Sequence, residues 1–228
     1  RSMAWGQPDK MDYARRAAGA LGYIALAGLD RVTATVLGPG EGNGPAPGYF
    51  PPHRGKQQAF ALFEFLVGLQ AGGQAHLRPA LARYAAAAMQ PGPLILISDL
   101  FDAAPAAPDR PADRSRPWAD GLNALAARGF EVTVLHVLAP DEVDPAAATW
   151  LDEGPGRDFR LLDSETRAPM EITADADLLE RYRRGVAAWQ EEIRRFCGAR
   201  GMHYVPVETS VPIDELLFAW LRHRGVLK

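Results

Sequence analysis

Residues 94–101, LILISDLF, constrain the fold of this chain more than any other segment. Four apolar residues follow two prolines and a glycine and lead into Ser98 and Asp99. A short apolar run bounded by turn residues is typical of a strand buried on both faces of a parallel sheet. The carboxyl ends of such strands border the ligand crevice in open α/β sheets. The sequence therefore predicts Asp99 at the mouth of any site, although an aspartate here also commonly caps a turn.

The remainder of the chain alternates helices with strands. Apolar spacing and cap residues predict helices at 9–27, 56–69, 77–89, 118–128, 175–199 and 213–224. Runs of β-branched and apolar residues predict strands at 32–37, 94–101, 130–138 and 203–207. Residues 159–162 and 170–173 form a predicted hairpin, inserted near 158–173. This alternation predicts an α/β fold with a doubly wound, mostly parallel sheet.

Composition narrows the class of protein. A chain of 228 residues, 47% of them hydrophobic, can bury the core of a single domain spanning 1–228. The net charge of −3 gives no electrostatic basis for binding nucleic acid or an anionic membrane. Cys197 is the only cysteine, which excludes an intrachain disulfide and favours a reducing compartment, so we expect a cytoplasmic protein. The longest apolar run, near 17–29, is too short to span a membrane.

The sequence lacks the catalytic motifs of several common enzyme classes. The chain has no G-x-S-x-G, no G-x-G-x-x-G after a strand, no H-E-x-x-H and no D-x-D after the 94–101 strand. The five histidines are scattered, and His136 lies among apolar residues that favour a core position over a ligand role. Oxygen atoms of Ser2, Ser98, Asp99 and Asp102 remain, and these suit a hard cation such as Mg²⁺. Two hypotheses stay open: a non-enzymatic binding module, or a metal-dependent hydrolase using Asp99 and Asp102.

Several segments together carry a resemblance to a known family. These are Arg1-Ser2-Met3 with residues 6–10, the LAGLDRV segment at 26–32, ISDLFD at 97–102, VLHVLAPDEVDP at 134–145, and 204–227. The chain resembles bacterial von Willebrand factor A-like proteins, and more closely the uncharacterised branch often encoded beside MoxR-type AAA+ ATPases. The resemblance implies a Rossmann-type fold, a protein-interaction role and a MoxR-type ATPase as partner in complex assembly.

The resemblance also implies a metal-ion-dependent adhesion site. In that superfamily the site combines a D-x-S-x-S loop, a threonine in a second loop and a late aspartate. Ser2 matches the second serine and Asp99 the late aspartate, whereas Ala75 stands where the threonine is expected. A methyl group cannot bind Mg²⁺, so we expect a degenerate site with weak or absent Mg²⁺ binding that Ala75→Thr would strengthen.

The same resemblance concerns the amino-terminal side of the fold. The family's Asp, its first Ser and its first central strand would precede Arg1. We therefore expect that the chain, as it stands, lacks the strand on which both halves of the sheet pack and is unstable in isolation.

Overall fold

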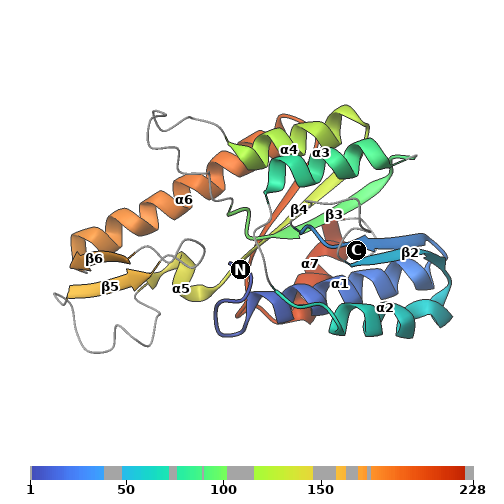
Figure 1. The fold of residues 1–228 in the computed structure, drawn as a ribbon, viewed down its shortest axis with the longest axis horizontal. Helices are drawn as coiled ribbons and strands as arrows, with labels where there is room; N and C mark the ends of the chain where they lie inside the picture. Colours follow the sequence, from blue (N-terminus) through green and yellow to red (C-terminus); the bar gives the residue numbers. More distant parts are fainter. Residues whose placement is uncertain are drawn as a thin grey trace.

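A three-stranded parallel sheet lies at the centre of the molecule, flanked by helices (Figure 1). The computed structural model describes residues 2–38, 48–71, 76–88, 90–101, 116–145, 158–162, 169–173 and 176–223. The strand order is β3 (Pro93–Ser98), β4 (Glu131–Leu138) and β7 (His203–Glu208), each parallel to its neighbour. Every residue of β4 after Glu131 is buried, because this strand has a neighbour on both sides and helices on both faces. The protein is therefore a mixed α/β protein, compatible with a Rossmann-like fold.

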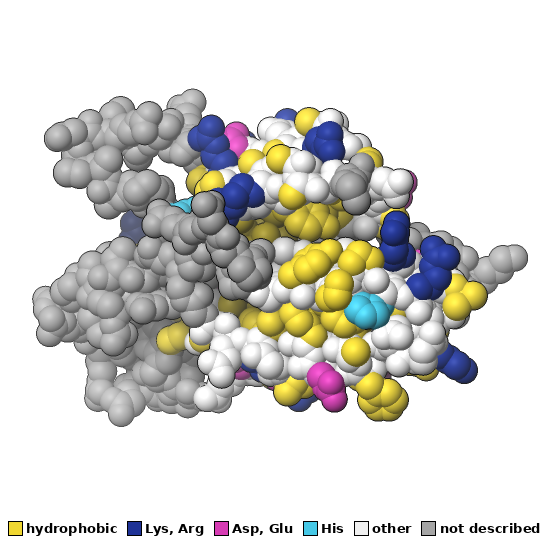
Figure 2. All heavy atoms as spheres, turned by 45° about the vertical axis from the view of Figure 1, so that its right-hand side comes forward, with side chains coloured by type: hydrophobic (Ala, Val, Ile, Leu, Met, Phe, Trp, Pro, Cys, Tyr) yellow, Lys and Arg dark blue, Asp and Glu magenta, His cyan; other side chains and the backbone are white. Residues whose placement is uncertain are grey.

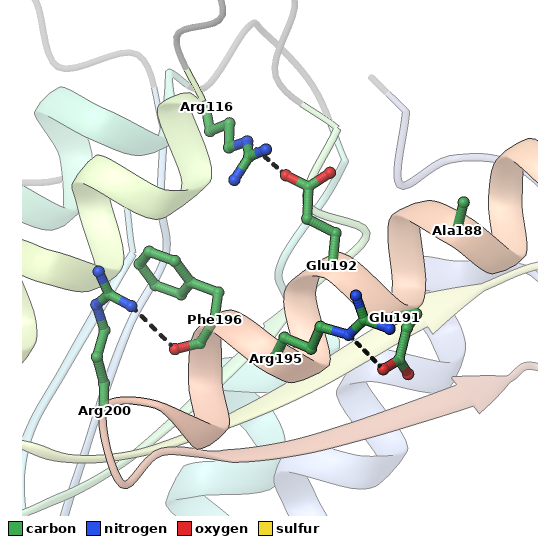
Figure 3. Close-up of a pocket in the computed structure, with 7 residues that line it drawn as sticks. All are labelled: Arg116, Ala188, Glu191, Glu192, Arg195, Phe196 and Arg200. Atoms are coloured by element: carbon green, nitrogen blue, oxygen red, sulfur yellow. Dashed lines mark hydrogen bonds and ion pairs between the residues drawn. The ribbon is translucent and has the colours of Figure 1, made fainter.

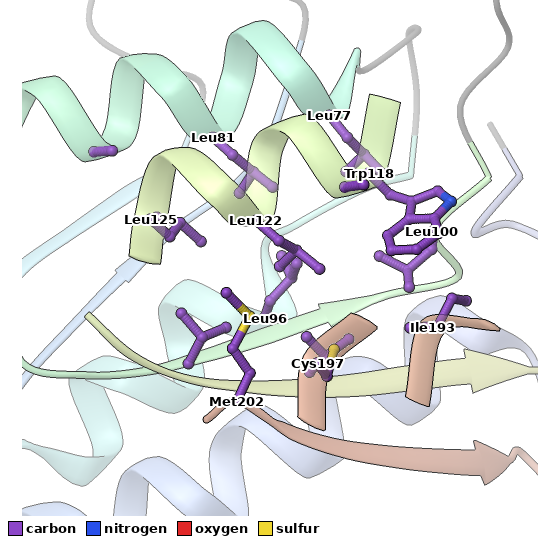
Figure 4. Packing of buried hydrophobic residues seen from close by; sticks show 14 residues of the cluster. Leu77, Leu81, Leu96, Leu100, Trp118, Leu122, Leu125, Ile193, Cys197 and Met202 are labelled. Carbon is purple, nitrogen blue, oxygen red and sulfur yellow. The ribbon is translucent and has the colours of Figure 1, made fainter. Parts of the chain in front are cut away.

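Helices cover the two faces of the sheet and bury separate apolar clusters. The helices are α1 (Lys10–Ala27), η1 (Lys56–Gln58), α2 (Ala59–Val67), α3 (Leu77–Ala87), α4 (Pro117–Ala127), α5 (Pro140–Val143), α6 (Ala176–Gly198) and α7 (Ile213–His223). One face packs against α3, α4 and the end of α6, where Leu96 meets Leu122 and Cys197 (Figure 4). The other face packs against α1 and the start of α7, through Tyr13 and Leu216. Helices on both faces explain why β3 and β4 read as apolar runs rather than as alternating patterns.

Two strands depart from the sequence-based expectation. β1 (Arg31–Thr35) was expected in the parallel sheet, and that prediction is wrong for the described residues. It pairs antiparallel with β2 (Tyr49–Arg54) in a separate two-stranded sheet. The β2 segment, YFPPHR, does not read as a strand because its two prolines each lack a donor, which confines such sequences to sheet edges. The predicted hairpin is confirmed: β5 (Asp158–Leu162) pairs antiparallel with β6 (Pro169–Thr173).

Among the described residues, β3 has a hydrogen-bonded neighbour on one side only, which is β4. Its residues Leu94, Ile95 and Ile97 are half-buried, although the segment is as apolar as β4. The carbonyl of Gly92 accepts from the backbone N–H of Glu131, at 3.1 Å. Because backbone groups alternate along a strand, the N–H and C=O groups of Ile95 and Ile97 point away from β4. Figure 2 shows hydrophobic side chains gathered in the middle of the face that it draws, between the upper and the lower helix layers, where Figure 1 places β1 and β2 as well as β3.

We expect the 228-residue chain, studied by itself, to self-associate through the edge of β3 that no strand among the described residues covers. An unpaired, apolar strand edge is a template for pairing with another chain. Ile95→Pro removes one outward N–H without breaking the ladder to β4, so it should shift the distribution toward monomer. Val67→Ser, which alters an exposed apolar side chain on α2, is the matched control and should not. Sedimentation velocity over a range of concentrations measures both, and a parent chain that is monomeric throughout would contradict the expectation.

Candidate functional site

A tight turn at the carboxyl end of β3 fixes Asp99 in position. The Ser98 Oγ accepts from the Leu100 N–H at 3.0 Å, and the Asp99 Oδ1 accepts from the Phe101 N–H at 3.3 Å. Leu100 adopts a left-handed backbone, φ 53°, which is costly for a residue with a β-carbon. Its side chain is buried in the core under α3 and α4, and that burial offsets the cost. Asp99 therefore both caps the turn and lies at the predicted edge, with only 2% of its surface exposed.

Lys10 is the partner of this buried carboxylate. Its side chain is completely buried, and its Nζ donates to Asp99 Oδ2 at 3.0 Å and to Glu142 Oε1 at 2.6 Å. The same ammonium lies 5.4 Å from the centre of the Phe101 ring, within the range of a cation–π contact. We call Lys10, Asp99 and Glu142 the ion cluster. A buried charge is tolerated only when it is paired, and here the lysine faces two carboxylates.

Local hydrogen bonds hold the backbone before Lys10 and the side chain of Glu142 in position. Lys10 is the first residue of α1, directly after the N-cap Asp9, whose Oδ1 accepts from the Asp12 N–H at 2.9 Å. Glu142 lies on α5, and its Oε2 accepts from the Ala139 N–H at 2.8 Å. Burial raises the pKa of Glu142, while the charge of Lys10 and the hydrogen bond from Ala139 act in the opposite direction. The site therefore holds Glu142 by both carboxylate oxygens.

His136 lies on β4 beside the turn and is bonded through both ring nitrogens. Nε2 is 3.0 Å from the Asp99 carbonyl oxygen, and Nδ1 is 2.7 Å from the Tyr204 hydroxyl. A carbonyl can only accept, so Nε2 carries the hydrogen and Nδ1 accepts from the tyrosine. Burial lowers the pKa of His136 to about 4, so the ring is neutral at pH 7. The prediction that His136 is a core residue is confirmed.

Three partly exposed aromatic side chains contact the ion cluster or the short α5 helix. We call Trp5, Phe101 and Tyr182 the aromatic rim; their exposed fractions are 49%, 41% and 41%. Trp5 Nε1 donates to Asp141 Oδ2 at 2.9 Å, and the Tyr182 hydroxyl donates to the Glu142 carbonyl at 2.9 Å. Phe101 stacks on Trp189 with ring centres 5.1 Å apart. These contacts join the start of the chain, the end of β3 and α6 at one edge of the sheet.

The structure brings together only part of the predicted site. Ser2 is half-buried in the turn before α1, next to Met3, whose carbonyl accepts from the Met11 N–H at 2.9 Å. Among the described residues, the Asp99 carboxylate is bonded to Lys10 and to the Phe101 N–H, and Ser2 is not one of its partners. Ala75 and Asp102 lie outside the described residues. The hydrolase hypothesis, which needs Asp102, therefore stays a prediction.

The described residues do not fit a Mg²⁺ ion at Asp99. Mg²⁺ requires near-octahedral oxygen ligands, whereas the Asp99 and Glu142 oxygens already face an ammonium group. Within the part of the chain that the structure describes, no group of three or more His, Cys, Asp or Glu side chains is placed to hold a metal ion.

Sequence reasoning missed Lys10 and Glu142. One signal was available: a lysine in the first turn of a helix opposes the helix dipole, so it needs a reason to be there.

A shallow hollow lies between the start of α4 and α6, apart from the ion cluster (Figure 3). Its lining residues are Arg116, Ala188, Glu191, Glu192, Arg195, Phe196 and Arg200. Arg116 pairs with Glu192, and Arg195 donates to Glu191 at 2.8 Å. The Arg200 guanidinium lies 3.7 Å above the Phe196 ring. Each arginine is therefore already partnered within the protein, and the hollow is a set of surface ion pairs rather than an anion site.

The fold and the site define a class: a mixed α/β protein with a buried ion cluster at the carboxyl edge of its parallel sheet. Comparisons with protein-family models, with curated proteins and with solved structures found no match to this chain. The von Willebrand factor A-like resemblance thus rests on the sequence segments that carry it. Across the described residues, no helix combines the length and the apolar character needed to cross a membrane.

Proposed function

We propose that this chain is a non-enzymatic protein-interaction module of von Willebrand factor A-like fold. Its proposed partner is a MoxR-type AAA+ ATPase, which it assists in complex assembly in the cytoplasm. The observation that carries the proposal is that the polar groups at the candidate site are buried and already paired. A general base or nucleophile must reach a substrate proton or reacting atom. Asp99 is bonded to Lys10, and both nitrogens of His136 are occupied.

The aromatic rim supports a docking role for the same edge. Aromatic residues are enriched at protein interfaces, where a ring offers a large apolar area and tryptophan or tyrosine adds a polar handle. Trp5 and Tyr182 each use that handle to bind the α5 segment, and Phe101 is fixed by its stack on Trp189. Side chains already held by such contacts lose less conformational entropy when a partner binds.

The arrangement of the sheet supports the finer description of the fold. β3, β4 and β7 are parallel, with α3 and α4 packed on one face and α1 and α7 on the other. Helices on both faces of a parallel sheet support our proposal of a doubly wound sheet. In such sheets the binding crevice lies at the carboxyl ends of the strands, where Asp99 and the rim are found.

Co-purification with a MoxR-type AAA+ ATPase from the same source tests the proposed function. We expect Phe101→Ala to weaken capture by about tenfold or more, as truncation of a central aromatic contact does at many interfaces. Phe60→Ala removes a side chain that is 77% exposed on α2, away from the rim, and should leave capture unchanged. Thermal melting of both variants separates lost docking from lost folding. Absence of enrichment over an unrelated AAA+ ATPase, or equal effects of the two variants, would refute the proposal.

A further inference from the structure

We propose that Lys10 is the resident cation of this edge of the sheet, a covalently attached replacement for a divalent metal ion. Its Nζ lies within hydrogen-bond distance of two carboxylate oxygens from different elements, Asp99 at the end of β3 and Glu142 on α5. Its own backbone belongs to α1. One positive charge therefore ties three segments together, as a metal ion bound to the same oxygens would do.

The position of Lys10 excludes a divalent ion from the same oxygens. Mg²⁺ binds oxygen at about 2.1 Å, so an ion on Asp99 Oδ2 would lie close to the ammonium and be repelled by it. The lysine has no exposed surface and therefore no open path by which to turn its charge to water. Its alternative would be an unpaired charge inside the protein, which is far more costly than the present pairing. The ammonium thus keeps its place.

The Lys10 ammonium, and not a missing hydroxyl, then accounts for the weak metal binding that we expect. The sequence alone suggested that the methyl group of Ala75 leaves a gap among the metal ligands. With Lys10 in place, restoring a hydroxyl by Ala75→Thr should not create a Mg²⁺ site, because the carboxylate that would anchor the ion already faces a cation. The inference concerns the same edge as the proposed docking, but it rests on the contacts of Lys10 and not on any partner.

Thermal melting in MgCl₂, compared with NaCl of equal ionic strength, tests the proposal. The parent chain should show the same Tm in both salts. Lys10→Ala leaves two facing carboxylates and a vacated volume, so millimolar Mg²⁺ should raise its Tm by about 3 °C or more over NaCl. Propylammonium, which carries the missing charged group, should also raise the Tm of this variant. Arg184→Ala removes one exposed positive charge from α6 and should gain nothing from either cation.

Specific outcomes overturn the inference. A parent chain stabilised by Mg²⁺ beyond the NaCl control would show that Lys10 does not exclude the metal. A Lys10→Ala variant that responds to neither Mg²⁺ nor propylammonium would show that the two carboxylates do not form a cation site. If that variant fails to fold, Lys10→Met, which keeps the apolar stem and vacates only the Nζ position, is measured in its place with Mg²⁺ alone, and the parent titration decides alone if neither folds. Partner capture is scored separately, so failed docking and failed cation replacement remain distinguishable.

Discussion

Lys10→Met should lower the free energy of unfolding by about 3–5 kcal/mol, the largest effect we expect from a single substitution. Removing one partner of a buried ion pair leaves the other charge buried without compensation, and that penalty is typically of this size. Asp99 is the charge left behind, because it is 2% exposed. Glu142, whose side chain is 15% exposed, is closer to solvent and is the easier of the two to rehydrate. Urea unfolding at pH 7 measures the loss.

Two further variants serve as controls for Lys10→Met. Asp99→Asn leaves the lysine bonded to Glu142, so it should cost clearly less than Lys10→Met. Arg184→Met breaks an exposed ion pair with Glu180 and should change stability little, because solvent screens such pairs. If Lys10→Met proves no more harmful than Arg184→Met, the ion cluster does not hold the edge of the sheet together.

Acidification from pH 7 to pH 4 should cost about 3 kcal/mol of stability through His136. In the unfolded chain an imidazole takes up a proton near pH 6.5, whereas burial lowers its pKa to about 4 in the folded protein. Between these values the unfolded state binds more protons than the folded state. Stability from this group is therefore fully present above pH 6.5 and is lost as the pH falls toward 4.

His136→Gln isolates this contribution. Glutamine can donate to the Asp99 carbonyl and accept from the Tyr204 hydroxyl, but it does not titrate. Unfolding free energies at successive pH values should fall less steeply for the variant than for the parent. Glu142 acts in the opposite direction, since its raised pKa makes its contribution greatest at low pH, and it is common to both proteins. Parallel curves for parent and variant would mean that His136 does not govern the acid sensitivity.

The sequence by itself determined the elements of this protein that depend on local spacing. The apolar periodicity of α1 and α6 and the β-branched runs of β3 and β4 were sufficient, because helices and buried strands select residues three to four apart or in short unbroken runs. The same reasoning placed Asp99 at a strand end and His136 in the core. Both follow from what immediately precedes and follows the residue in the chain.

Only the tertiary structure decided how those elements are used. β2 carries two prolines and forms a strand because β1 pairs with it in a small two-stranded sheet. No local sequence pattern predicts this pairing. The partners of Lys10 lie 89 and 132 residues further along the chain. Sequence spacing predicts contacts only within a helical turn or a pair of adjacent strands. It therefore predicted that Asp99 lies at the edge of the sheet but could not predict that Lys10 is its counter-ion. The cation that Asp99 faces was set by the packing of α1, β3 and α5, which brings one ammonium group between two carboxylates.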